Sequence, residues 1–324
     1  MTRTIAVADI GGTHARFALA EVDHGRVVSL ADPMTQNTAD HPSFQLAWQD
    51  FGKWLGRALP DALGISFAGP VGGEVLKLTN NPWVIRPALM QEKLGVSDCK
   101  IVNDFGAIAY AVARFGDDHY EHVCGPAGAL PEAGITTIVG PGTGLGVAQL
   151  LRIHNDYHVL ETEGGHIDFA PLDSVEDHVL AHLRRSFRRV SVERVVAGSG
   201  LSNIYNSLAA LEGKAVVHTD DVALWQAAID GSDALAAAAL DRFFLSLGAV
   251  AGDLALAHGA NAVVLAGGLG LRLKDRFASS GFAGRFIAKG RFERRMEAIP
   301  VKLITHPQPG LYGAAAAFAK EFSN

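Results

Sequence analysis

The chain has 324 residues, more than one hydrophobic core usually serves, so we expect two domains with a cleft between them. Its net charge of -6 and sequence pI of about 6.1 give no support to a role in nucleic-acid binding. A phosphate ligand would therefore have to be bound locally, by backbone amides, a metal ion or a few placed cations.

The cysteine count and the apolar stretches narrow the class of protein further. Two cysteines, Cys99 and Cys124, are too few for a disulfide framework or a four-cysteine zinc site, so we expect reduced thiols in a cytoplasmic protein. The first apolar run is interrupted by Asp9 and is too short for a signal peptide. Two uncharged stretches, Ala133–Leu151 and Leu254–Leu271, are too rich in glycine for membrane-spanning helices, and we expect buried strands running into turns.

The first elements in the chain form a predicted β-hairpin. Residues 4–8 are an apolar run typical of a buried strand, and Arg16–Val22 fits a second strand after the turn Asp9–Thr13. Helical periodicity follows over Phe44–Leu59 and ends at Pro60.

A second series of strands and helices follows the hairpin. We expect strands at Ala62–Ala68 and Lys100–Asn103, and a helix over Asp104–Arg114. Ile135–Gly140 then repeats the opening pattern, because a strand meets a glycine-rich turn and resumes as Leu145–Leu151. When the Gly-Thr pairs of the two turns are aligned, the predicted strands before and after each turn also align. This match indicates a weak internal duplication.

The second half of the chain is rich in helix-forming residues. We expect helices over Val222–Ile229, Asp233–Ala257 and Pro309–Phe322. Ala262–Ala266 reads as a buried strand that opens onto a Gly-Gly pair. Strands precede helices in both halves, so the predicted fold class is α/β.

Three glycine-rich turns each follow an apolar strand, at Asp9–Thr13, Gly140–Gly146 and Ala266–Gly270. Glycine lets backbone N–H groups approach a phosphate, and a neighbouring threonine adds a hydroxyl donor. Asp9 would repel a phosphate unless a Mg²⁺ ion lay between them, held directly or through water. Any one turn could be a simple hairpin or corner, but the three together favour a nucleotide site.

Two commoner nucleotide motifs are excluded. Gly-Lys-Ser and Gly-Lys-Thr occur nowhere in the sequence, so there is no Walker A loop. The segment Gly140–Leu145 lacks the last glycine of GxGxxG and is followed by an apparent strand, whereas a Rossmann site usually has a helix there.

Polar residues outside these turns supply candidate acids and bases. Asn103 and Asp104 stand where a strand meets a helix, so they could be helix-capping residues or could include a general base for a hydroxyl. Glu163, His166 and Asp168 share a flexible turn. A His-x-Asp pair is also part of one type of iron site, but no obvious second histidine completes it.

A basic cluster surrounds another candidate carboxylate. Glu193 is expected in a first helical turn, where the helix dipole favours an acid. The arginines of this cluster are Arg184, Arg185, Arg188, Arg189 and Arg194. On a helix, Arg184 would be a neighbour of Arg188 and Arg185 a neighbour of Arg189 on one side, which indicates a solvated face, with an anion site or a subunit contact as the alternatives.

Taken together, these residues resemble a known family. From Asp9 to the Leu311–Ala315 segment, the chain is similar to bacterial glucokinases of the hexokinase-related group. No cysteine cluster follows His166, so the zinc site and DNA-binding role of repressor-type sugar kinases are not expected. The motifs that carry the resemblance are Asp9-Ile-Gly-Gly-Thr13, Asn103-Asp104-Phe105, Gly140-Pro-Gly-Thr-Gly-Leu-Gly146, Glu163-Gly-Gly-His166 and Glu193-Arg194-Val195.

The resemblance implies a fold, a reaction and partners. The fold is the duplicated, actin-like ATPase (ribonuclease H-like) α/β fold, with residues 1–114 and 307–324 as a small domain and 115–306 as a large domain around a cleft. The reaction is ATP-dependent phosphorylation of glucose to glucose 6-phosphate with Mg²⁺. The implied protein is a cytoplasmic homodimer that binds neither nucleic acid nor a membrane.

The resemblance also implies site residues. Asp104 is the general base, and Asp9 lies near Mg²⁺, which it holds through water. The implied nucleotide-binding residues are Ala8, Asp9, Ile10, Gly11, Gly12, Thr13, Gly142, Thr143, Gly144, Gly267 and Gly268. The implied sugar-binding residues are Asn103, Asp104, Glu163, His166, Glu193 and, from the loop Leu78–Trp83, Asn80.

Several alternatives stay open at this point. The acceptor could be fructose, mannose or an N-acetylhexosamine, and the donor could be ADP or polyphosphate. The chain could instead be a non-catalytic sugar sensor, which would need a DNA-binding or partner module. The first predicted strand begins at Thr4, which leaves no room for an N-terminal helix-turn-helix.

Overall fold

The structure is a computed structural model that describes residues 2–78 and 81–322. The chain divides into two compact units, which are described separately. Unit 1 contains Met1–Gly116, Val159–Glu161 and His306–Asn324, and unit 2 contains Asp117–His158 and Thr162–Thr305.

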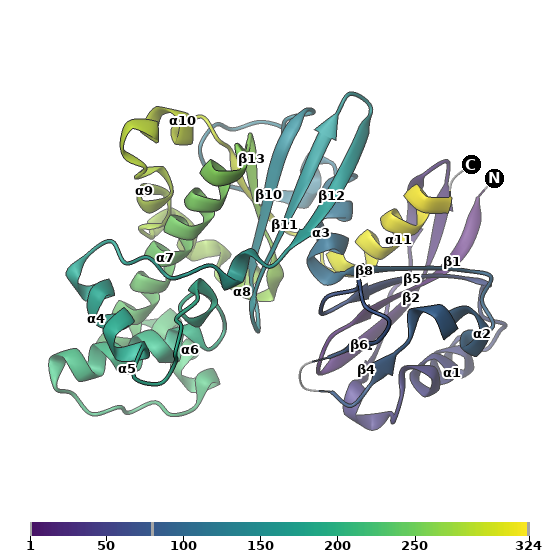
Figure 1. The fold of residues 1–324 in the computed structure, drawn as a ribbon, viewed down its shortest axis with the longest axis horizontal. Coiled ribbons are helices and arrows are strands. Elements are labelled where there is room, and N and C mark those ends of the chain that lie inside the picture. The colour runs from purple at the N-terminus through teal and green to yellow at the C-terminus, as the bar shows by residue number, and fades with distance from the viewer. Residues whose placement is uncertain (1, 79–80, 323–324) are drawn as a thin grey trace. The chain divides into compact units, whose positions relative to one another are not determined.

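Unit 1 combines one main sheet with helices on both of its faces (Figure 1). In chain order its strands are β1 (Arg3–Ile10), β2 (His14–Asp23), β3 (Arg26–Leu30), β4 (Met34–Asn37), β5 (Ala62–Phe67), β6 (Leu76–Lys77), β7 (Val84–Ile85) and β8 (Asp98–Asn103). Its helices are η1 (Thr38–Asp40), α1 (Phe44–Leu55), η2 (Pro87–Leu89), α2 (Met90–Leu94), α3 (Asp104–Val112) and α11 (Pro309–Phe322), where η marks a 3-10 helix.

The main sheet of unit 1 has the strand order β3-β2-β1-β5-β8, with β4 also paired to β2. β1 and β2 are antiparallel and pair Asp9 with Arg16, which confirms the predicted hairpin. β5 runs parallel to both β1 and β8. Parallel strands of this kind are covered on both faces, which explains why β5 is buried throughout.

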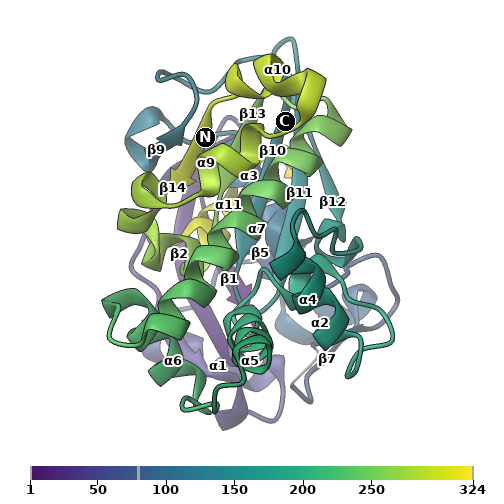
Figure 2. The same cartoon turned by 90° about the vertical axis from the view of Figure 1, so that its left-hand side faces the viewer.

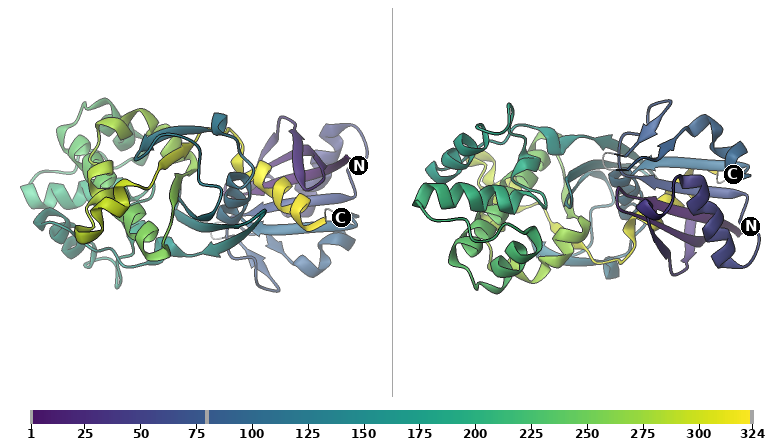
Figure 3. Two further views of the ribbon diagram at one scale, coloured as in Figure 1. Left: turned by 90° about the horizontal axis from the view of Figure 1, so that it is seen from above. Right: turned by 90° about the horizontal axis from the view of Figure 1, so that it is seen from below.

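Alternating side chains of β1 pack into two hydrophobic cores, one on each face of the sheet. Ile5 and Val7 pack with α11, and the left view of Figure 3 shows this yellow helix against the purple strands. Ala6, Ala8 and Ile10 face the opposite core. That core contains an aromatic group from β2, α1 and the segment before β7, namely Phe17, Phe44, Trp48, Phe51 and Trp83. The period of two along β1 therefore fixes which helix covers which face.

Helix α1 is shorter than its sequence pattern indicates. It begins after Ser43, whose side chain accepts a hydrogen bond from the N–H of Leu46, but it ends at Leu55. Gly56 takes the left-handed conformation with φ of 67° and accommodates the chain reversal that ends the helix. The prediction of a helix reaching Leu59 was wrong, because a glycine C-cap ends the helix before the proline does.

Unit 2 has a second sheet and most of the helices. Its strands are β9 (Tyr120–Cys124), β10 (Gly134–Pro141), β11 (Leu145–Ile153), β12 (Asp156–Thr162), β13 (Ala262–Leu265) and β14 (Val301–Ile304). β12 pairs in this sheet, but its residues Val159–Glu161 belong to unit 1. Its helices are η3 (Asp117–His119), η4 (Gly164–His166), α4 (Ser174–Leu183), η5 (Val192–Arg194), α5 (Gly200–Glu212), α6 (Asp221–Asp230), α7 (Ala234–His258), α8 (Gly267–Arg272), η6 (Lys274–Ser279), α9 (Phe282–Ile287), η7 (Gly290–Phe292) and α10 (Glu293–Glu297).

The sheet of unit 2 repeats the topology of unit 1. Its order is β12-β11-β10-β13-β14-β9, so an antiparallel meander is again followed by parallel strands. Gly140 pairs with Gly146 across the hairpin, just as Asp9 and Ile10 pair with the start of β2 in unit 1. The internal duplication expected from the two Gly-Thr turns is therefore present in the strand order.

Helix α7 forms the centre of the unit 2 core, and Figure 2 shows it with α5 and α6 alongside. Among the described residues it is the one helix long and apolar enough to cross a membrane, but 67 % of its most apolar window is buried inside the protein. It also corrects one prediction. The stretch from Leu254 to Leu271 is not made of strands alone, because its first turn ends α7 and its last residues lie in α8.

The arginine cluster does not lie on one helix. α4 ends at Leu183, so the predicted pairing of arginines along a helix face was wrong. Arg189 instead donates to the carboxylate of Asp168 and to a backbone carbonyl. Arg194 lies over the ring of Phe187, with 4.3 Å between its guanidinium carbon and the ring centroid. These arginines support loops rather than forming one basic surface stripe.

Candidate active site

The carboxyl ends of three parallel strands meet at one edge of the unit 1 sheet. Ile10 of β1 is level with Phe67 of β5, and Phe67 is level with Asn103 of β8. Ligands of open α/β sheets bind outside this edge, because the loops that follow the strands converge there. The first glycine turn and the Asn103–Asp104 pair therefore belong to the same edge of one unit.

Asp9 is the most constrained acid at this edge. The hydroxyl of Ser66 donates to its Oδ1 at 2.8 Å, and Arg16 lies 3.5 Å from its Oδ2. The first turn of α11 also lies against this carboxylate, since a Cβ added to Gly310 would come 2.9 Å from the Asp9 carboxyl carbon. Burial raises the pKa of Asp9, and the contacts with Ser66 and Arg16 oppose that rise.

The surroundings of Asp9 suit a magnesium ion that is shared with a phosphate ligand. Mg²⁺ usually takes one or two protein carboxylates and completes its octahedron with water and phosphate oxygens. Across residues 2–78 and 81–322, no group of three or more histidine, cysteine or acidic side chains could hold a metal by itself. A single, well-held carboxylate fits that kind of ion and does not fit an all-protein metal cage.

The turn after Asp9 is held by its carbonyl groups. The N–H of Gly11 donates to the carbonyl of His14 at 2.9 Å, and Thr38 donates to the carbonyl oxygens of Gly12 and Thr13. Among residues 2–78 and 81–322, no atom beyond the chain neighbours of Gly12 lies within 4 Å of a Cβ placed on it. The carbonyl contacts thus fix the turn, and its glycines carry no side chain that would cover the backbone.

Asn103 caps helix α3 and thereby places Asp104. Its Oδ1 accepts hydrogen bonds from the N–H groups of Phe105 at 2.9 Å and Gly106 at 3.1 Å. Its amide nitrogen donates to the carbonyl of Gly69 at 3.1 Å, which ties the helix start to the end of β5. The capping interpretation of Asn103 is therefore confirmed, and it puts Asp104 on the first helical residue, where the helix dipole favours a carboxylate.

The sugar-side loop is described only in part. Asn80 lies outside the described residues. Its neighbour Asn81 accepts a hydrogen bond from the N–H of Trp83 at 2.7 Å and reaches the carbonyl of Gly12 at 3.4 Å. This loop therefore packs beside the first glycine turn.

In unit 2, the second and third glycine turns lie together. The N–H of Gly142 donates to the carbonyl of Gly144 at 2.8 Å, which closes the turn around Thr143. Gly267 has a φ of 86°, and a Cβ there would lie 2.7 Å from the carbonyl oxygen of Pro141. Only glycine fits this position without strain, and Gly268 follows it in the first turn of α8.

Glu193 reaches into the second glycine turn. Its Oε2 accepts a hydrogen bond from the N–H of Leu145 at 2.9 Å, and a side chain on Gly144 would collide with the same oxygen. Glu193 lies in the short 3-10 helix η5 rather than at the start of a longer helix. The sequence did not predict this contact, because the two residues are 48 positions apart.

The Glu163–His166 turn packs on the same strand. Gly164 and Gly165 lie against Val147 and Leu145 of β11, where any side chain would collide. The N–H of Val192 donates to the carbonyl of Ile167 at 2.9 Å, which joins this turn to the segment of Glu193. The structure thus brings three predicted sugar ligands of unit 2 together around one strand, with Nε2 of His166 lying 3.9 Å from Oε2 of Glu163.

The sequence reasoning did not identify three residues that support the predicted site. Ser66 is the single polar side chain of β5, a signal that could have identified it. Gly310 is in the first turn of α11, and only the packing of that helix shows why it must be small. Glu161 is an exposed glutamate in β12 that accepts a hydrogen bond from the N–H of Asn103, and the sequence gives no local sign of it.

Comparisons with known proteins give the family of the chain. The sequence matches the glucokinase family over residues 6–321. It is 61 % identical over 319 residues to the glucokinase of Zymomonas mobilis subsp. mobilis, a match that covers 98 % of each chain.

Solved structures share the fold. The glucokinase of an Antarctic psychrotroph is similar with a TM-score of 0.85 and 33 % identity, covering 97 % of this chain and 98 % of that one. A ROK family glucokinase from Streptomyces griseus, solved with glucose and AMPPNP, has a TM-score of 0.61 at 22 % identity, covering 97 % of this chain and 98 % of that one. The two similar sheets are those of the duplicated, actin-like ATPase fold. The chain belongs to the glucokinase family.

Proposed function

We propose that the chain transfers the γ-phosphoryl group of ATP to the 6-hydroxyl of glucose, with Asp104 as the general base. Glucose phosphorylation is the activity of the family to which the chain belongs. The observation that carries the residue assignment is the strand register of unit 1, which puts the ends of β1 and β8 two strands apart at one edge. Neighbouring strands are about 4.8 Å apart, so Asp9 and Asp104 extend from strand ends about 10 Å apart.

In this mechanism Asp104 acts on the acceptor. The glucose 6-hydroxyl gives its proton to the Asp104 carboxylate as its oxygen forms a bond to the γ-phosphorus. The bond from that phosphorus to the bridging oxygen of ADP breaks, and ADP leaves with the electron pair. Phosphoryl transfer needs alignment and charge neutralisation more than covalent help, so a fixed carboxylate on the first turn of a helix suits this task.

The glycine turns are assigned to the nucleotide. Within the turns Gly11–Thr13 and Gly142–Gly144, the N–H groups of Gly11 and Gly142 already donate inside their own turns. The other backbone N–H groups of the two turns would donate to phosphate oxygens, and Gly267 and Gly268 would lie near the adenosine. Ala8 and Ile10 flank Asp9 on β1 and complete this set. Bound Mg²⁺ would supply charge neutralisation at the phosphates, and Asp9 would hold it through water.

The remaining polar residues are assigned to the sugar. Asn103, Glu163, His166 and Glu193 would form hydrogen bonds with its hydroxyl groups, and Asn80 would add a contact from the sugar-side loop. Carboxylates accept strong, charge-assisted hydrogen bonds from hydroxyls, so such a site would reject analogues that lack those hydroxyls.

The organisation of the enzyme is also part of the proposal. Residues 1–114 and 307–324 would act as the small domain and 115–306 as the large domain. ATP is the proposed donor, in keeping with the Streptomyces griseus relative that was solved with AMPPNP. A cytoplasmic homodimer that binds neither nucleic acid nor a membrane is the proposed state, because it is what family membership favours.

The test of Asp104 is the variant Asp104→Asn, which keeps the shape of the side chain and removes the base. We expect kcat to fall by at least about a hundredfold while glucose binding measured by calorimetry is retained. Asp32→Asn, at an exposed aspartate, is the matched control and should keep normal kinetics. Turnover of Asp104→Asn close to that of the original enzyme would show that another group accepts the proton.

A further inference from the structure

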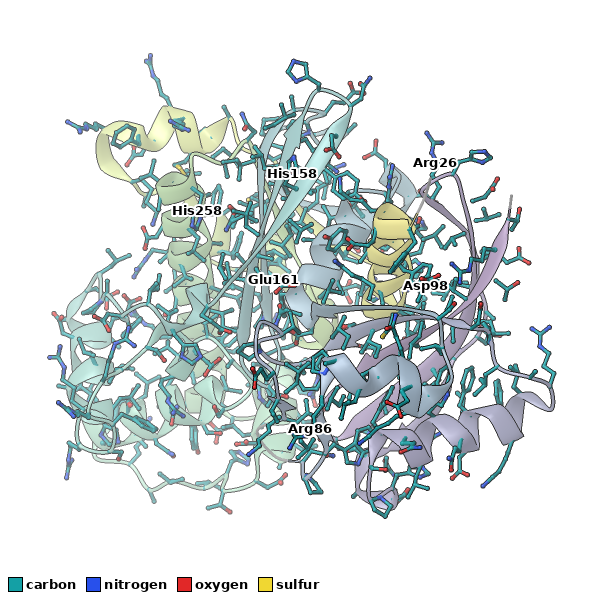
Figure 4. All side chains as sticks on the ribbon, turned by 45° about the vertical axis from the view of Figure 1, so that its right-hand side comes forward. Arg26, Arg86, Asp98, His158, Glu161 and His258 are labelled. Atoms are coloured by element: carbon teal, nitrogen blue, oxygen red, sulfur yellow. The ribbon has the colours of Figure 1, made fainter. Side chains whose placement is uncertain are left out.

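Glu161 makes a contact with the segment that carries the proposed base. Its Oε1 accepts a hydrogen bond of 2.8 Å from the backbone N–H of Asn103, the residue directly before Asp104. Figure 4 labels Glu161 on its strand, and the contact joins β12 to the start of α3 within unit 1. The two residues are 58 positions apart in the sequence, so the contact is a product of the fold.

The contact completes a helix cap in an unusual way. In a capping box the N-cap side chain accepts a hydrogen bond from the N–H of the third helical residue, and an acid at that third position accepts one from the N-cap N–H. Asn103 makes the first of these bonds, to Gly106 at 3.1 Å. Gly106 has no side chain to make the second, and Glu161 makes it from another strand.

The shape of the helix supports this assignment. A Cβ added to Gly106 would lie 2.6 Å from Oε1 of Glu161 and 2.9 Å from its Cγ, and the three nearest atoms all belong to Glu161. Glycine at the third position therefore leaves the space that the carboxylate occupies. Two independent features, the hydrogen bond and the missing side chain, point to the same partner.

The sequence around Glu161 connects it directly to the Glu163–His166 turn. Glu163, a proposed sugar ligand, follows two residues later. Thr162 between them is anchored by a hydrogen bond from its hydroxyl to the carbonyl of Val147 at 2.9 Å. Only Thr162 therefore separates the carboxylate that caps α3 from the first residue of the Glu163–His166 turn.

We propose that Glu161 is a positioning residue, which orients the Asn103–Asp104 turn and couples that orientation to the Glu163–His166 turn. This inference rests on the proposed role of Asp104. Glu161 acts through the backbone of Asn103 and needs no contact with glucose or ATP. Losing the cap would let the first turn of α3 fray, and an error of about 1 Å in the base can cost about a hundredfold in rate.

The first test compares two replacements of Glu161. Glu161→Ala removes the acceptor, so we expect kcat to fall about tenfold or more and the glucose KM to rise, with the ATP KM within about twofold of normal. Glu161→Gln keeps a side-chain oxygen that can accept from Asn103 and should retain kcat within about threefold. Glu132→Ala, at an exposed glutamate in a loop of unit 2, is the matched control and should behave normally.

The second test uses Gly106 and does not depend on changing Glu161 alone. Gly106→Ala should displace the Glu161 carboxylate and reproduce the fall in kcat. Added to Glu161→Ala, the same change should cost less than about twofold more, because the atoms that it would strike are gone. Equal losses from Gly106→Ala in both backgrounds would contradict the proposal.

Circular dichroism and thermal melting of every variant separate positioning from folding. A lower melting temperature of Glu161→Ala with unchanged kcat and glucose KM would show a structural role only and overturn the inference. Equal impairment of Glu161→Gln and Glu161→Ala would also overturn it. Asp104→Asn is measured in parallel: normal turnover there defeats the proposed base, whereas an inactive Asp104→Asn beside a normal Glu161→Ala defeats this inference alone.

Discussion

The N–H of Leu145 donates a 2.9 Å hydrogen bond to Oε2 of Glu193. One residue belongs to the second glycine turn, which we assign to phosphate, and the other is a proposed sugar ligand. A single carboxylate therefore holds the turn that we assign to phosphate and also belongs to the set that we assign to the sugar. This arrangement lets neighbouring glycines of one turn be distinguished by experiment.

Gly144→Ala should act through the sugar and Gly142→Ala through the nucleotide. A methyl group at Gly144 collides with Glu193, so we expect the glucose KM to rise about tenfold. The nearest protein atom to a methyl group at Gly142 is 4.0 Å away, so the fold is undisturbed and the ATP KM should rise instead. Steady-state kinetics with each substrate varied in turn measures both effects.

The control for this pair is Gly284→Ala, a helical glycine with no atom within 4 Å of the added methyl group, which should leave both KM values unchanged. A Gly142→Ala enzyme with normal ATP affinity would remove the second turn from the phosphate site.

Ser66→Ala should change the acid limb of the pH profile. Burial raises the pKa of Asp9 above its ordinary value of 3.8, and the hydrogen bond from Ser66 opposes that rise. Removing the hydrogen bond should therefore raise the pKa of Asp9 further. Asp9 must be ionised to hold Mg²⁺, so kcat/KM for ATP should fall at a higher pH in the variant as the solution is acidified. An acid limb that stays in place or moves to lower pH would show that Asp9 does not control it.

The same shift has a consequence for stability. A carboxyl whose pKa is raised in the folded state binds its proton more tightly there than in the unfolded chain. The contribution of Asp9 to the free energy of unfolding is therefore largest at low pH. It is lost as the pH rises through the raised pKa that Asp9 has in the folded protein. Urea unfolding at several pH values should show Ser66→Ala losing this contribution over a higher pH range than the original protein.

Both cysteine thiols should be unreactive in the folded protein. Burial raises the pKa of Cys99 to about 12 and that of Cys124 to about 11, and the thiolate is the reactive form. We expect a thiol reagent at pH 8 to modify neither residue rapidly until the protein is unfolded in guanidinium, when both should react. Rapid modification of either thiol in the folded enzyme would contradict this prediction.

Arg285→Ala should destabilise unit 2. Nη2 of Arg285 lies 2.9 Å from Oδ2 of Asp173 and 2.9 Å from Oε1 of Glu176, whose side chain is only 3 % exposed. Arg242 also donates to Asp173 and lies 4.0 Å from Oε1 of Glu176, so it would compensate part of the charge that the variant leaves unpaired. We therefore expect Arg285→Ala to lower the free energy of unfolding by about 2 kcal/mol. The exposed Arg188→Ala is the control and should change stability by less than about 0.5 kcal/mol, as measured by urea unfolding.

Local sequence patterns predicted most elements because their signals are local. The run at residues 4–8, the turn Asp9–Thr13 and the helix Pro309–Phe322 all correspond to structural elements. The end of α1 was missed because a left-handed Gly56 outweighed the later proline. The prediction that Arg184–Arg189 lie on a helix was wrong, because an arginine-rich segment carries no signal that marks the end of α4 at Leu183.

The site was less predictable than the fold. Motifs placed Asp9, Asp104 and Glu193 on turns, but the contacts of Glu193 with Leu145 and of Glu161 with Asn103 depend on strand pairing across long separations. Gly106 and Gly310 look like ordinary helical glycines in the sequence. Only the folded chain shows why they must be small, because a Cβ on Gly106 would collide with Glu161 and one on Gly310 with Asp9.

The most direct test of the central claim is the rate of sugar phosphorylation by the purified enzyme with Mg²⁺, measured by coupling ADP formation to a second enzyme. With ATP we expect glucose to be phosphorylated with a kcat/KM at least about a hundredfold above that for fructose, mannose or N-acetylglucosamine. Replacing ATP by ADP or polyphosphate, with glucose 6-phosphate then measured directly, should abolish the reaction. Equal or faster phosphorylation of another hexose, or no turnover of glucose with ATP, would contradict the account.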